Sequence, residues 1–187
     1  METEEEKLEP PKRGVFIVFE GLDRSGKSTQ AKMLFEKLSR DGVKAKLIRF
    51  PERSSAVGSL IDAALQQAAA VEPHVLHLLF AANRWEQQQQ IEKWLAAGFA
   101  VVADRFLAAA AAAGTCAAAV GVVYSTTAAN HRAAAAAAAA PESGGPVGAP
   151  VPISEAFARS TEKGLLAPDR VYFLDIKPEE AAKREGF

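Results

Sequence analysis

Apolar residues along this chain form short continuous runs that alternate with stripes at helical spacing. The run from Val15 to Phe19 is unbroken by polar residues, which is typical of a strand covered on both faces in a parallel sheet. Similar runs predict further strands, and apolar side chains spaced three and four apart predict helices. The expected strands are 15–19, 44–50, 99–103 and 171–174, and the expected helices are 27–40, 55–67, 72–98 and one opening at Pro178. This alternation predicts an α/β fold, a mostly parallel sheet flanked by helices.

Charged residues stand where several of these strands end. In a parallel sheet the carboxyl ends of the strands meet at one edge, and ligands bind there. The charged residues at or near such ends are Glu20, Arg49, Asp104 and Asp175. We therefore expect the functional site along this edge.

The segment after the first strand carries the most specific motif. Residues 21–28 read GLDRSGKS, which fits the phosphate-binding pattern G-x-x-x-x-G-K-[ST] between a strand and a helix. The glycines let backbone N–H groups point at phosphate oxygens, and the following helix contributes its positive N-terminus. Lys27 is expected between the β- and γ-phosphates, and Ser28 is a candidate Mg²⁺ ligand. Asp104, after the 99–103 strand, is the carboxylate expected to hold the same ion through water.

Two residues inside this loop need a separate explanation. Asp23 places a carboxylate beside the expected phosphates, which is unfavourable unless it bonds to a sugar hydroxyl or a cation. Arg24 would place a guanidinium where charge develops on the γ-phosphoryl group, as an arginine finger supplied in cis does. The alternative for Arg24 is an exposed loop arginine.

A second group of basic and aromatic residues suggests a second phosphorylated ligand. Bidentate guanidinium groups suit a phosphate monoester, although each alone is more often a surface charge; the candidates are Arg49, Arg53 and Arg105. Phe80 and Arg84 are four residues apart on one helix face, so a ring for stacking and a guanidinium for a base carbonyl would lie together. The alternative is a core phenylalanine beside a surface arginine.

Composition narrows the class of protein. The net charge of −1 argues against a protein that holds nucleic acid by bulk charge, and no apolar run approaches the length of a membrane span. The single cysteine, Cys116, gives no intrachain disulfide, and the N-terminal residues are acidic, the wrong sign for a leader. We expect a cytoplasmic or nuclear protein that binds neither membrane nor nucleic acid.

The expected organisation is a charged, flexible leader over 1–13 and one domain over 14–187. Within that domain, 19 of the 33 residues from 108 to 140 are alanine. Such a stretch is either a low-complexity insertion or a region where unidentified side chains are written as alanine. We favour the second, because a long alanine tract has little apolar bulk to pack and little charge to keep it in solution. The last predicted helix begins shortly before residue 187, so we expect that further C-terminal sequence is missing.

Taken together, the motifs resemble the thymidylate kinases of the eukaryotic type, in the subgroup with an arginine in the phosphate loop. The resemblance rests on segments in the family's order: FIVFEGLDRSGKSTQ at 16–30, RFPER at 49–53, HLLFAANRWE at 77–86 and Asp104-Arg105, and it returns at 164–184. It implies the fold of the P-loop nucleoside monophosphate kinases, a parallel sheet in a three-layer α/β/α arrangement with a mobile lid. It also implies transfer of the γ-phosphoryl group of ATP to dTMP, giving dTDP, with Mg²⁺ and usually in a homodimer.

The resemblance also implies roles for individual residues. The ATP phosphates would be held by Gly21, Leu22, Asp23, Arg24, Ser25, Gly26, Lys27, Ser28 and Thr29, with Arg184 near the adenine. The dTMP would be bound by Asp23 at its 3′-hydroxyl, Arg53 and Arg105 at its phosphate, Phe80 and Arg84 at thymine, and Phe50 as a wall. The catalytic residues would be Arg24, Lys27 and Arg105, and the metal would be held by Ser28 and Asp104.

The chain also departs from the family pattern. After Asp104-Arg105 the family has an aromatic residue, then Ser-Gly and a second aromatic, whereas here Phe106-Leu107 precedes six alanines. Other readings therefore stay open: another P-loop nucleotide or nucleoside kinase, or a catalytically inactive nucleotide-binding homologue. A GTPase-type switch is disfavoured, because the base-reading sequence Asn-Lys-x-Asp does not occur in the chain.

Overall fold

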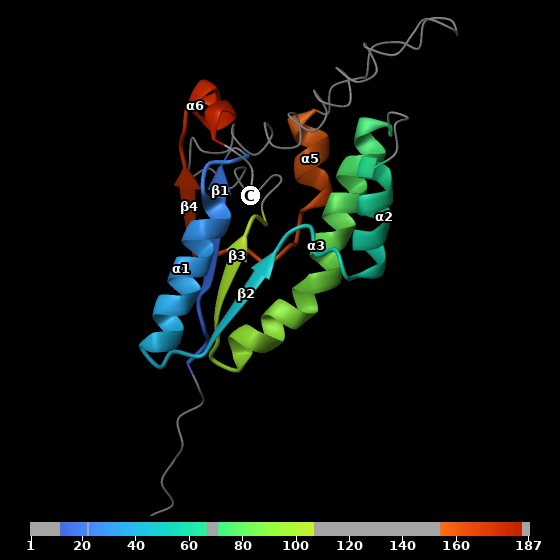
Figure 1. The fold of residues 1–187 in the computed structure, drawn as a ribbon. Helices are drawn as coiled ribbons and strands as arrows, with labels where there is room; N and C mark the ends of the chain where they lie inside the picture. The colour runs from blue at the N-terminus through green and yellow to red at the C-terminus, as the bar shows by residue number, and fades with distance from the viewer. Residues whose placement is uncertain (1–11, 22, 67–70, 107–153, 185–187) are drawn as a thin grey trace, which may run out of the picture.

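The computed structural model describes residues 12–21, 23–66, 71–106 and 154–184. Figure 1 draws the remaining residues as a grey trace. Several sequence-based expectations lie outside the described residues: those for Leu22, Leu107, the alanine-rich stretch, Cys116 and the first eleven residues of the predicted leader.

A parallel sheet lies at the centre of the described part of the chain (Figure 1). Its strands are β1 (Phe16–Gly21), β2 (Ala45–Arg49), β3 (Ala100–Asp104) and β4 (Arg170–Leu174), in the order β2-β3-β1-β4. All three strand pairs are parallel, with Phe16 opposite Val101 and Ala45 opposite Ala100. The carboxyl ends of the strands therefore meet at one edge, as predicted. The strand that precedes the phosphate loop, β1, lies between β3 and β4.

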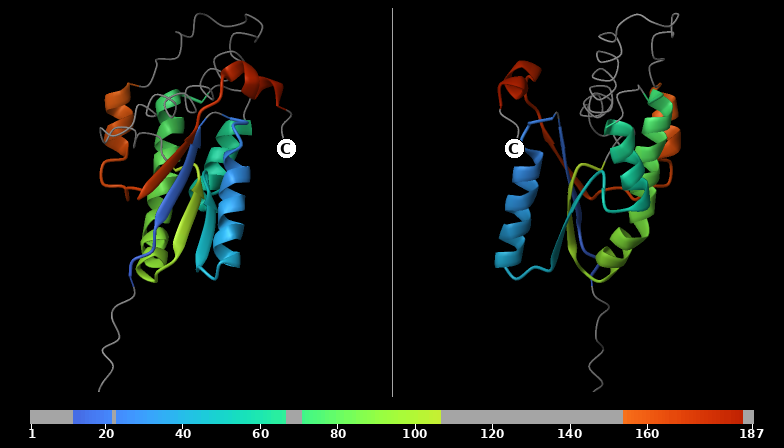
Figure 2. Two further views of the ribbon diagram at one scale, coloured as in Figure 1. Left: turned by 90° about the vertical axis from the view of Figure 1, so that its left-hand side faces the viewer. Right: turned by 45° about the vertical axis from the view of Figure 1, so that its right-hand side comes forward.

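Helices cover both faces of the sheet (Figure 2). They are α1 (Lys27–Arg40), α2 (Ala56–Gln66), α3 (Pro73–Ala96), α5 (Glu155–Thr161) and α6 (Pro178–Lys183). Helix α1 lies against one face, while α3 lies against the other and contacts α2 and α5. This three-layer α/β/α arrangement confirms the predicted fold class.

The long helix α3 begins and ends where its sequence allows. Pro73 occupies the first turn, where its missing N–H costs nothing, and the Glu72 carboxylate accepts a hydrogen bond from Val75 N at 3.1 Å. The chain then leaves the helix through Gly98, whose φ of 80° is easy only for glycine. The sequence predicts both ends of this helix to within two residues.

Helix α5 is not predicted by the sequence. It has fewer than two turns, and its apolar residues are Phe157 and the alanines on either side of it. Its start is defined by a local cap, in which the Ser154 hydroxyl accepts a hydrogen bond from Phe157 N at 3.2 Å. Its position depends on contacts with α3, which no pattern within 155–161 encodes.

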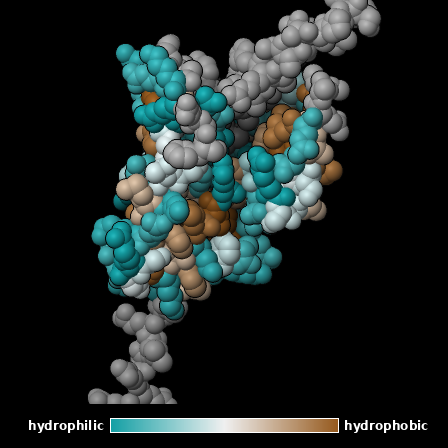
Figure 3. All heavy atoms as spheres, viewed as in Figure 1, coloured by the Kyte–Doolittle hydropathy of each residue, from teal (hydrophilic) through white to brown (hydrophobic). Residues whose placement is uncertain are grey.

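The core is divided by the sheet into two layers, as the alternation of side chains along each strand requires. On one face Phe16 and Val18 pack with Val101, Ile91 and the neighbouring apolar side chains of α3. On the other face Phe19 and Val102 pack against Ala31 of α1. Figure 3 shows mostly hydrophilic residues on the viewed face, with hydrophobic residues near its centre and at the upper right, where α2 and α3 lie in Figure 1.

None of the helices within the described ranges combines the length and apolarity that a membrane-spanning helix needs.

We predict that Ile91→Ala lowers the free energy of unfolding by about 2–5 kcal/mol, because Ile91 is 0% exposed and its loss leaves a cavity between α3 and the sheet. The matched surface control is Met33→Ala on α1, where the side chain is 56% exposed and the expected change is within about 1 kcal/mol. Urea unfolding measures both. Equal losses for the two variants would contradict this account of the core.

Candidate active site

The phosphate loop runs from the end of β1 into the first turn of α1. Gly21 and Gly26 have φ values of 141° and 98°, a region that disfavours side chains. At Gly21 an added Cβ would also meet the backbone oxygen of Leu174 at 2.5 Å. Lys27 is buried, and its Nζ donates to the carbonyl oxygen of Gly21 at 2.9 Å. The loop thus curls around its own lysine, as a phosphate cradle does.

Burial, and to a smaller extent the positive charge of Arg105, lowers the pKa of Lys27 to about 8. The carboxylates of Asp23, Glu20 and Asp104 act in the opposite direction but do not restore the ordinary value. The negative charge around the ammonium therefore does not offset the effect of its burial. A phosphate group placed beside Lys27 would supply that charge and stabilise its protonated form.

Two arginines at this edge have left-handed backbones. Arg24 has a φ of 64° and Arg105 a φ of 68°, and no other non-glycine residue in the described ranges has a positive φ. Such conformations cost on the order of 1–3 kcal/mol each and are found mainly where function requires them. The guanidinium of Arg105 donates to Asp23 Oδ1 at 2.7 Å, across the gap between the segments that follow β3 and β1.

Arg184, at the end of α6, lies against the outside of the phosphate loop. Its Nη1 donates to the carbonyl oxygens of Arg24 at 3.3 Å and Ser25 at 3.4 Å. In return, Nη1 of Arg24 donates to the carbonyl oxygen of Arg184 at 3.2 Å. The structure therefore brings Arg184 to the loop itself, and its expected place near adenine stays a prediction.

The two predicted metal ligands are in contact. Ser28 Oγ donates to Asp104 Oδ2 at 2.5 Å, and Arg49 Nε lies 3.4 Å from the same oxygen. The other carboxylate oxygen, Asp104 Oδ1, is buried and has no hydrogen-bond partner among the described residues. A hydroxyl and a carboxylate with an unused oxygen are hard donors, so these residues fit a divalent cation such as Mg²⁺.

The residues expected to hold the second ligand are less closely assembled. Phe50 is buried, with its ring centroid 5.1 Å from that of Phe106, and Phe80 is half-buried on α3. Arg53 Nη1 lies 3.2 Å from Asp62 Oδ1 on α2, so its guanidinium is held at α2. Thr29, the last predicted loop residue, is exposed on α1.

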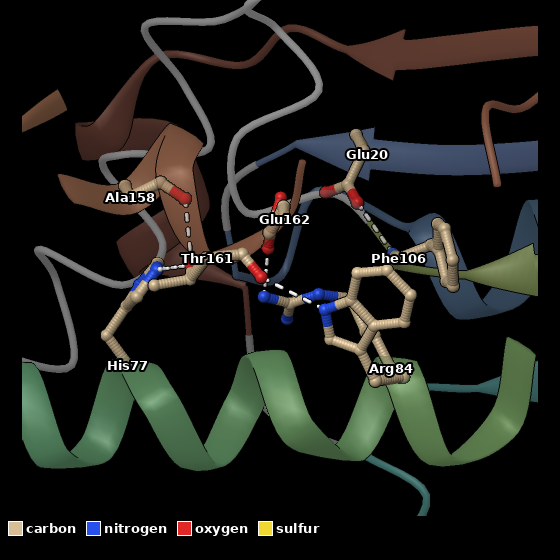
Figure 4. Close-up of polar contacts among 8 residues, drawn as sticks. Glu20, His77, Arg84, Phe106, Ala158, Thr161 and Glu162 are labelled. Carbon is tan, nitrogen blue, oxygen red and sulfur yellow. Dashed lines mark hydrogen bonds and ion pairs between the residues drawn. The ribbon is translucent and has the colours of Figure 1, made fainter. Parts of the chain in front are cut away.

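Arg84 is buried, so the interpretation of this residue as a surface arginine is wrong. Its Nη2 donates to the carboxylate of Glu162, just after α5 (Figure 4). Burial lowers the pKa of Arg84, while the negative charge of Glu162 and, more weakly, of Glu20 favours the charged form. The sequence gives no signal for Glu162, because it lies in a segment without a predicted element.

Two further residues organise the site. Asn83 is fully buried: its Oδ1 accepts from Glu52 N at 2.8 Å, and its Nδ2 donates to Glu52 O at 3.1 Å and Ser55 Oγ at 3.0 Å. It thereby fixes the segment that carries Arg53. The sequence does contain a signal for Asn83: it lies seven residues after Leu76, so its amide is on the apolar side of α3.

Glu20, near the end of β1, fixes a second segment of the site. Its Oε1 accepts a hydrogen bond from Phe106 N at 2.8 Å, which ties the residues after β3 to the end of β1.

Comparison with known proteins identifies the family. A family model described as thymidylate kinase matches residues 19–131. The chain is 38% identical over 185 residues to a thymidylate kinase of Caenorhabditis elegans, covering 94% of this chain and 69% of that protein. It is 38% identical over 176 residues to a thymidylate kinase of Homo sapiens, covering 94% and 68%. The chain belongs to the thymidylate kinase family.

A solved structure agrees with this assignment. The thymidylate kinase of Candida albicans matches with a TM-score of 0.63 and 34% identity, covering 93% of this chain and 68% of that chain. The range matched by the thymidylate kinase family model contains the phosphate loop, Asp104 and Arg105, whereas Arg184 lies beyond it.

We predict that Lys27→Met raises the free energy of unfolding below pH 8, by on the order of 1 kcal/mol at pH 7. The pKa of Lys27 falls from 10.5 to about 8 on folding, so between these values the unfolded chain binds more protons than the folded one. The stability of the unsubstituted protein should therefore rise with pH over this range, and the gap to Lys27→Met should close.

Urea unfolding from pH 7 to pH 10 measures this gap. The control is Lys32→Met, which makes the same change on the exposed face of α1 and removes no buried charge. A gap for Lys27→Met that stays constant with pH would contradict the assigned cause.

Proposed function

We propose that this chain transfers the γ-phosphoryl group of ATP to dTMP, producing dTDP and ADP, as a thymidylate kinase with its catalytic arginine in the phosphate loop. One observation supports this most directly. The phosphate loop and the Asp104-Arg105 turn are joined by the Ser28–Asp104 hydrogen bond and by the 2.7 Å contact between Arg105 and Asp23. A cradle for donor phosphates thus faces a guanidinium suited to an acceptor phosphate.

The proposed catalysis is positioning together with charge neutralisation. The attacking phosphate oxygen of dTMP is already an anion, so no strong general base is required. Lys27 and Arg24 would balance the charge that develops on the transferred phosphoryl group, and Arg105 with Arg53 would hold the acceptor phosphate. The left-handed backbones of Arg24 and Arg105 are costly conformations of the kind found where function requires them, which supports these roles.

The base and sugar would be bound by residues from several elements. Phe80 would stack on thymine, Arg84 would donate to a base carbonyl and Phe50 would form a wall. Asp23 would accept a hydrogen bond from the 3′-hydroxyl. Its present partner, Arg105, would then turn toward the phosphate that lies at the other end of the same sugar.

We propose Mg²⁺ as the ion held by Ser28 and Asp104, with Asp104 Oδ1 as the available carboxylate oxygen. When bound, the ion neutralises part of the phosphate charge. The residues Gly21 to Thr29 would hold the ATP phosphates, and Arg184 would approach the adenine from the end of α6.

We also propose that 14–187 form one kinase domain and that the protein is a homodimer. Exposed apolar side chains on adjacent helices support the second proposal: Leu60 and Leu65 on α2, and Val75 and Leu78 on α3. A single cysteine is compatible with a reducing compartment such as the cytoplasm.

Purified protein with ATP and Mg²⁺ should release ADP only when a suitable acceptor is present. We predict that dTMP is a better substrate than dCMP, because an arginine can donate to a 4-carbonyl but not to a 4-amino group. We also predict that it is better than thymidine, which lacks the phosphate that Arg53 and Arg105 would hold, and UMP, which keeps the 4-carbonyl, completes the panel. A coupled assay for ADP gives kcat/KM for each acceptor. Preference for thymidine would indicate a nucleoside kinase, and no acceptor-dependent release would indicate an inactive homologue.

We predict that Arg24→Ala lowers kcat by on the order of 10³-fold, the range found for arginine fingers, with a much smaller change in the KM for dTMP. The control is Arg40→Ala at the exposed end of α1, which should keep normal turnover. Steady-state kinetics at saturating ATP measures both variants. Near-normal kcat for Arg24→Ala would show that Arg24 is not catalytic.

A further inference from the structure

Helix α3 holds the end of α5 and the turn after it through a row of polar contacts (Figure 4). These are His77 Nε2 with Thr161 Oγ1 at 3.0 Å, Trp85 Nε1 with Thr161 O at 3.0 Å, Arg84 with Glu162, and Gln88 Oε1 with Leu166 N at 3.0 Å. Thr161 is thus fixed from two sides. The carboxylate of the next residue, Glu162, is therefore held at a defined place beside α3.

Arg84 and Glu162 form a buried charge pair. Their side chains are 6% and 7% exposed, and an isolated charge at such a depth would be strongly unfavourable. The other groups that act on Arg84 do not replace Glu162. Glu20 contributes more weakly, and His77 cannot supply a negative charge; burial and the nearby Arg84 charge lower its pKa.

The contact with Glu162 leaves part of the guanidinium unused. Nη2 donates to Glu162, while the buried Nε of Arg84 has no hydrogen-bond partner among the described residues. A guanidinium has only donors, so the group that completes this site must be an acceptor. The 4-carbonyl of thymine or uracil meets this requirement, whereas the 4-amino group of cytosine does not.

We infer that Glu162 is a positioning residue for Arg84: it binds Nη2 and so leaves the Nε of the guanidinium for the 4-carbonyl of the acceptor base. This inference rests on the dTMP binding of the proposed function, in which Arg84 donates to that base. A neutral base carbonyl cannot balance the charge of a buried guanidinium, so the counter-charge must come from the protein. Glu162 supplies it and at the same time fixes which edge of Arg84 faces the ligand.

The test compares Glu162→Gln with Glu36→Gln, the same change at an exposed position of α1. Isothermal titration calorimetry gives Kd values for dTMP, dCMP and ATP with each variant. For Glu162→Gln we expect the Kd for dTMP to rise about tenfold and the preference for dTMP over dCMP to fall by a similar factor. The Kd for ATP should stay within about twofold, and Glu36→Gln should match the unsubstituted protein in all three measurements.

A double-variant cycle separates positioning from a general structural role. If Glu162 acts through Arg84, adding Glu162→Gln to Arg84→Gln should change the Kd for dTMP by less than about twofold. A tenfold rise in both backgrounds would overturn the inference, as would unchanged dTMP binding by folded Glu162→Gln. Should Glu162→Gln fail to fold, Glu162→Asp replaces it: the shorter carboxylate moves the guanidinium, so weaker dTMP binding with unchanged ATP binding is required.

The same experiment keeps the two proposals apart. Unsubstituted protein that binds dTMP but does not phosphorylate it would contradict the proposed function and leave the inference on Glu162 standing. Unsubstituted protein that binds ATP but not dTMP would contradict both. Normal dTMP phosphorylation with no effect of Glu162→Gln on dTMP binding would overturn only the inference on Glu162.

Discussion

The hydrogen bonds between the segment after β1 and the end of β3 hold the candidate site together. Ser28 bonds to Asp104, Asp23 pairs with Arg105, and Glu20 accepts a hydrogen bond from the backbone just beyond Arg105. Each bond joins a residue at or after the end of β1 to a residue at or after the end of β3, so the register of these two strands sets the distance between the phosphate loop and the Asp104-Arg105 turn. The fold thereby aligns the two halves of the proposed phosphoryl-transfer site.

Positive charge is concentrated at this edge at a cost to the stability of the fold. Lys27 loses its water, and Arg24 and Arg105 have left-handed backbones that most residues avoid. A bound phosphate would relieve the electrostatic part of this cost, so ligand binding and folding stability are coupled at the same atoms. Arg184 donates hydrogen bonds to the carbonyl oxygens of Arg24 and Ser25, which stabilises the strained turn of the loop.

Sequence patterns predict the parts of this molecule that depend on local order. The strands, the helices α1 to α3 and the phosphate loop follow from apolar runs, helical spacing and a contiguous motif, and the Ser28–Asp104 contact follows because parallel strands end together. The contacts of Arg84 and of Asn83 could not be predicted in the same way. Their partners, Glu162 and the 52–55 segment, are distant in sequence and reach α3 only through tertiary packing.

The hydrogen bonds of Asn83 have a geometric consequence for the proposed acceptor. Asn83 holds the segment bearing Arg53, and the next residue of the same helix is Arg84. One helix therefore carries both the residue proposed to bind the base and the anchor of the residue proposed to bind the phosphate. The distance between the residues that would bind the base and those that would bind the phosphate is then fixed. A nucleotide with a longer phosphate chain would extend past Arg53, and a nucleoside without phosphate would not reach it.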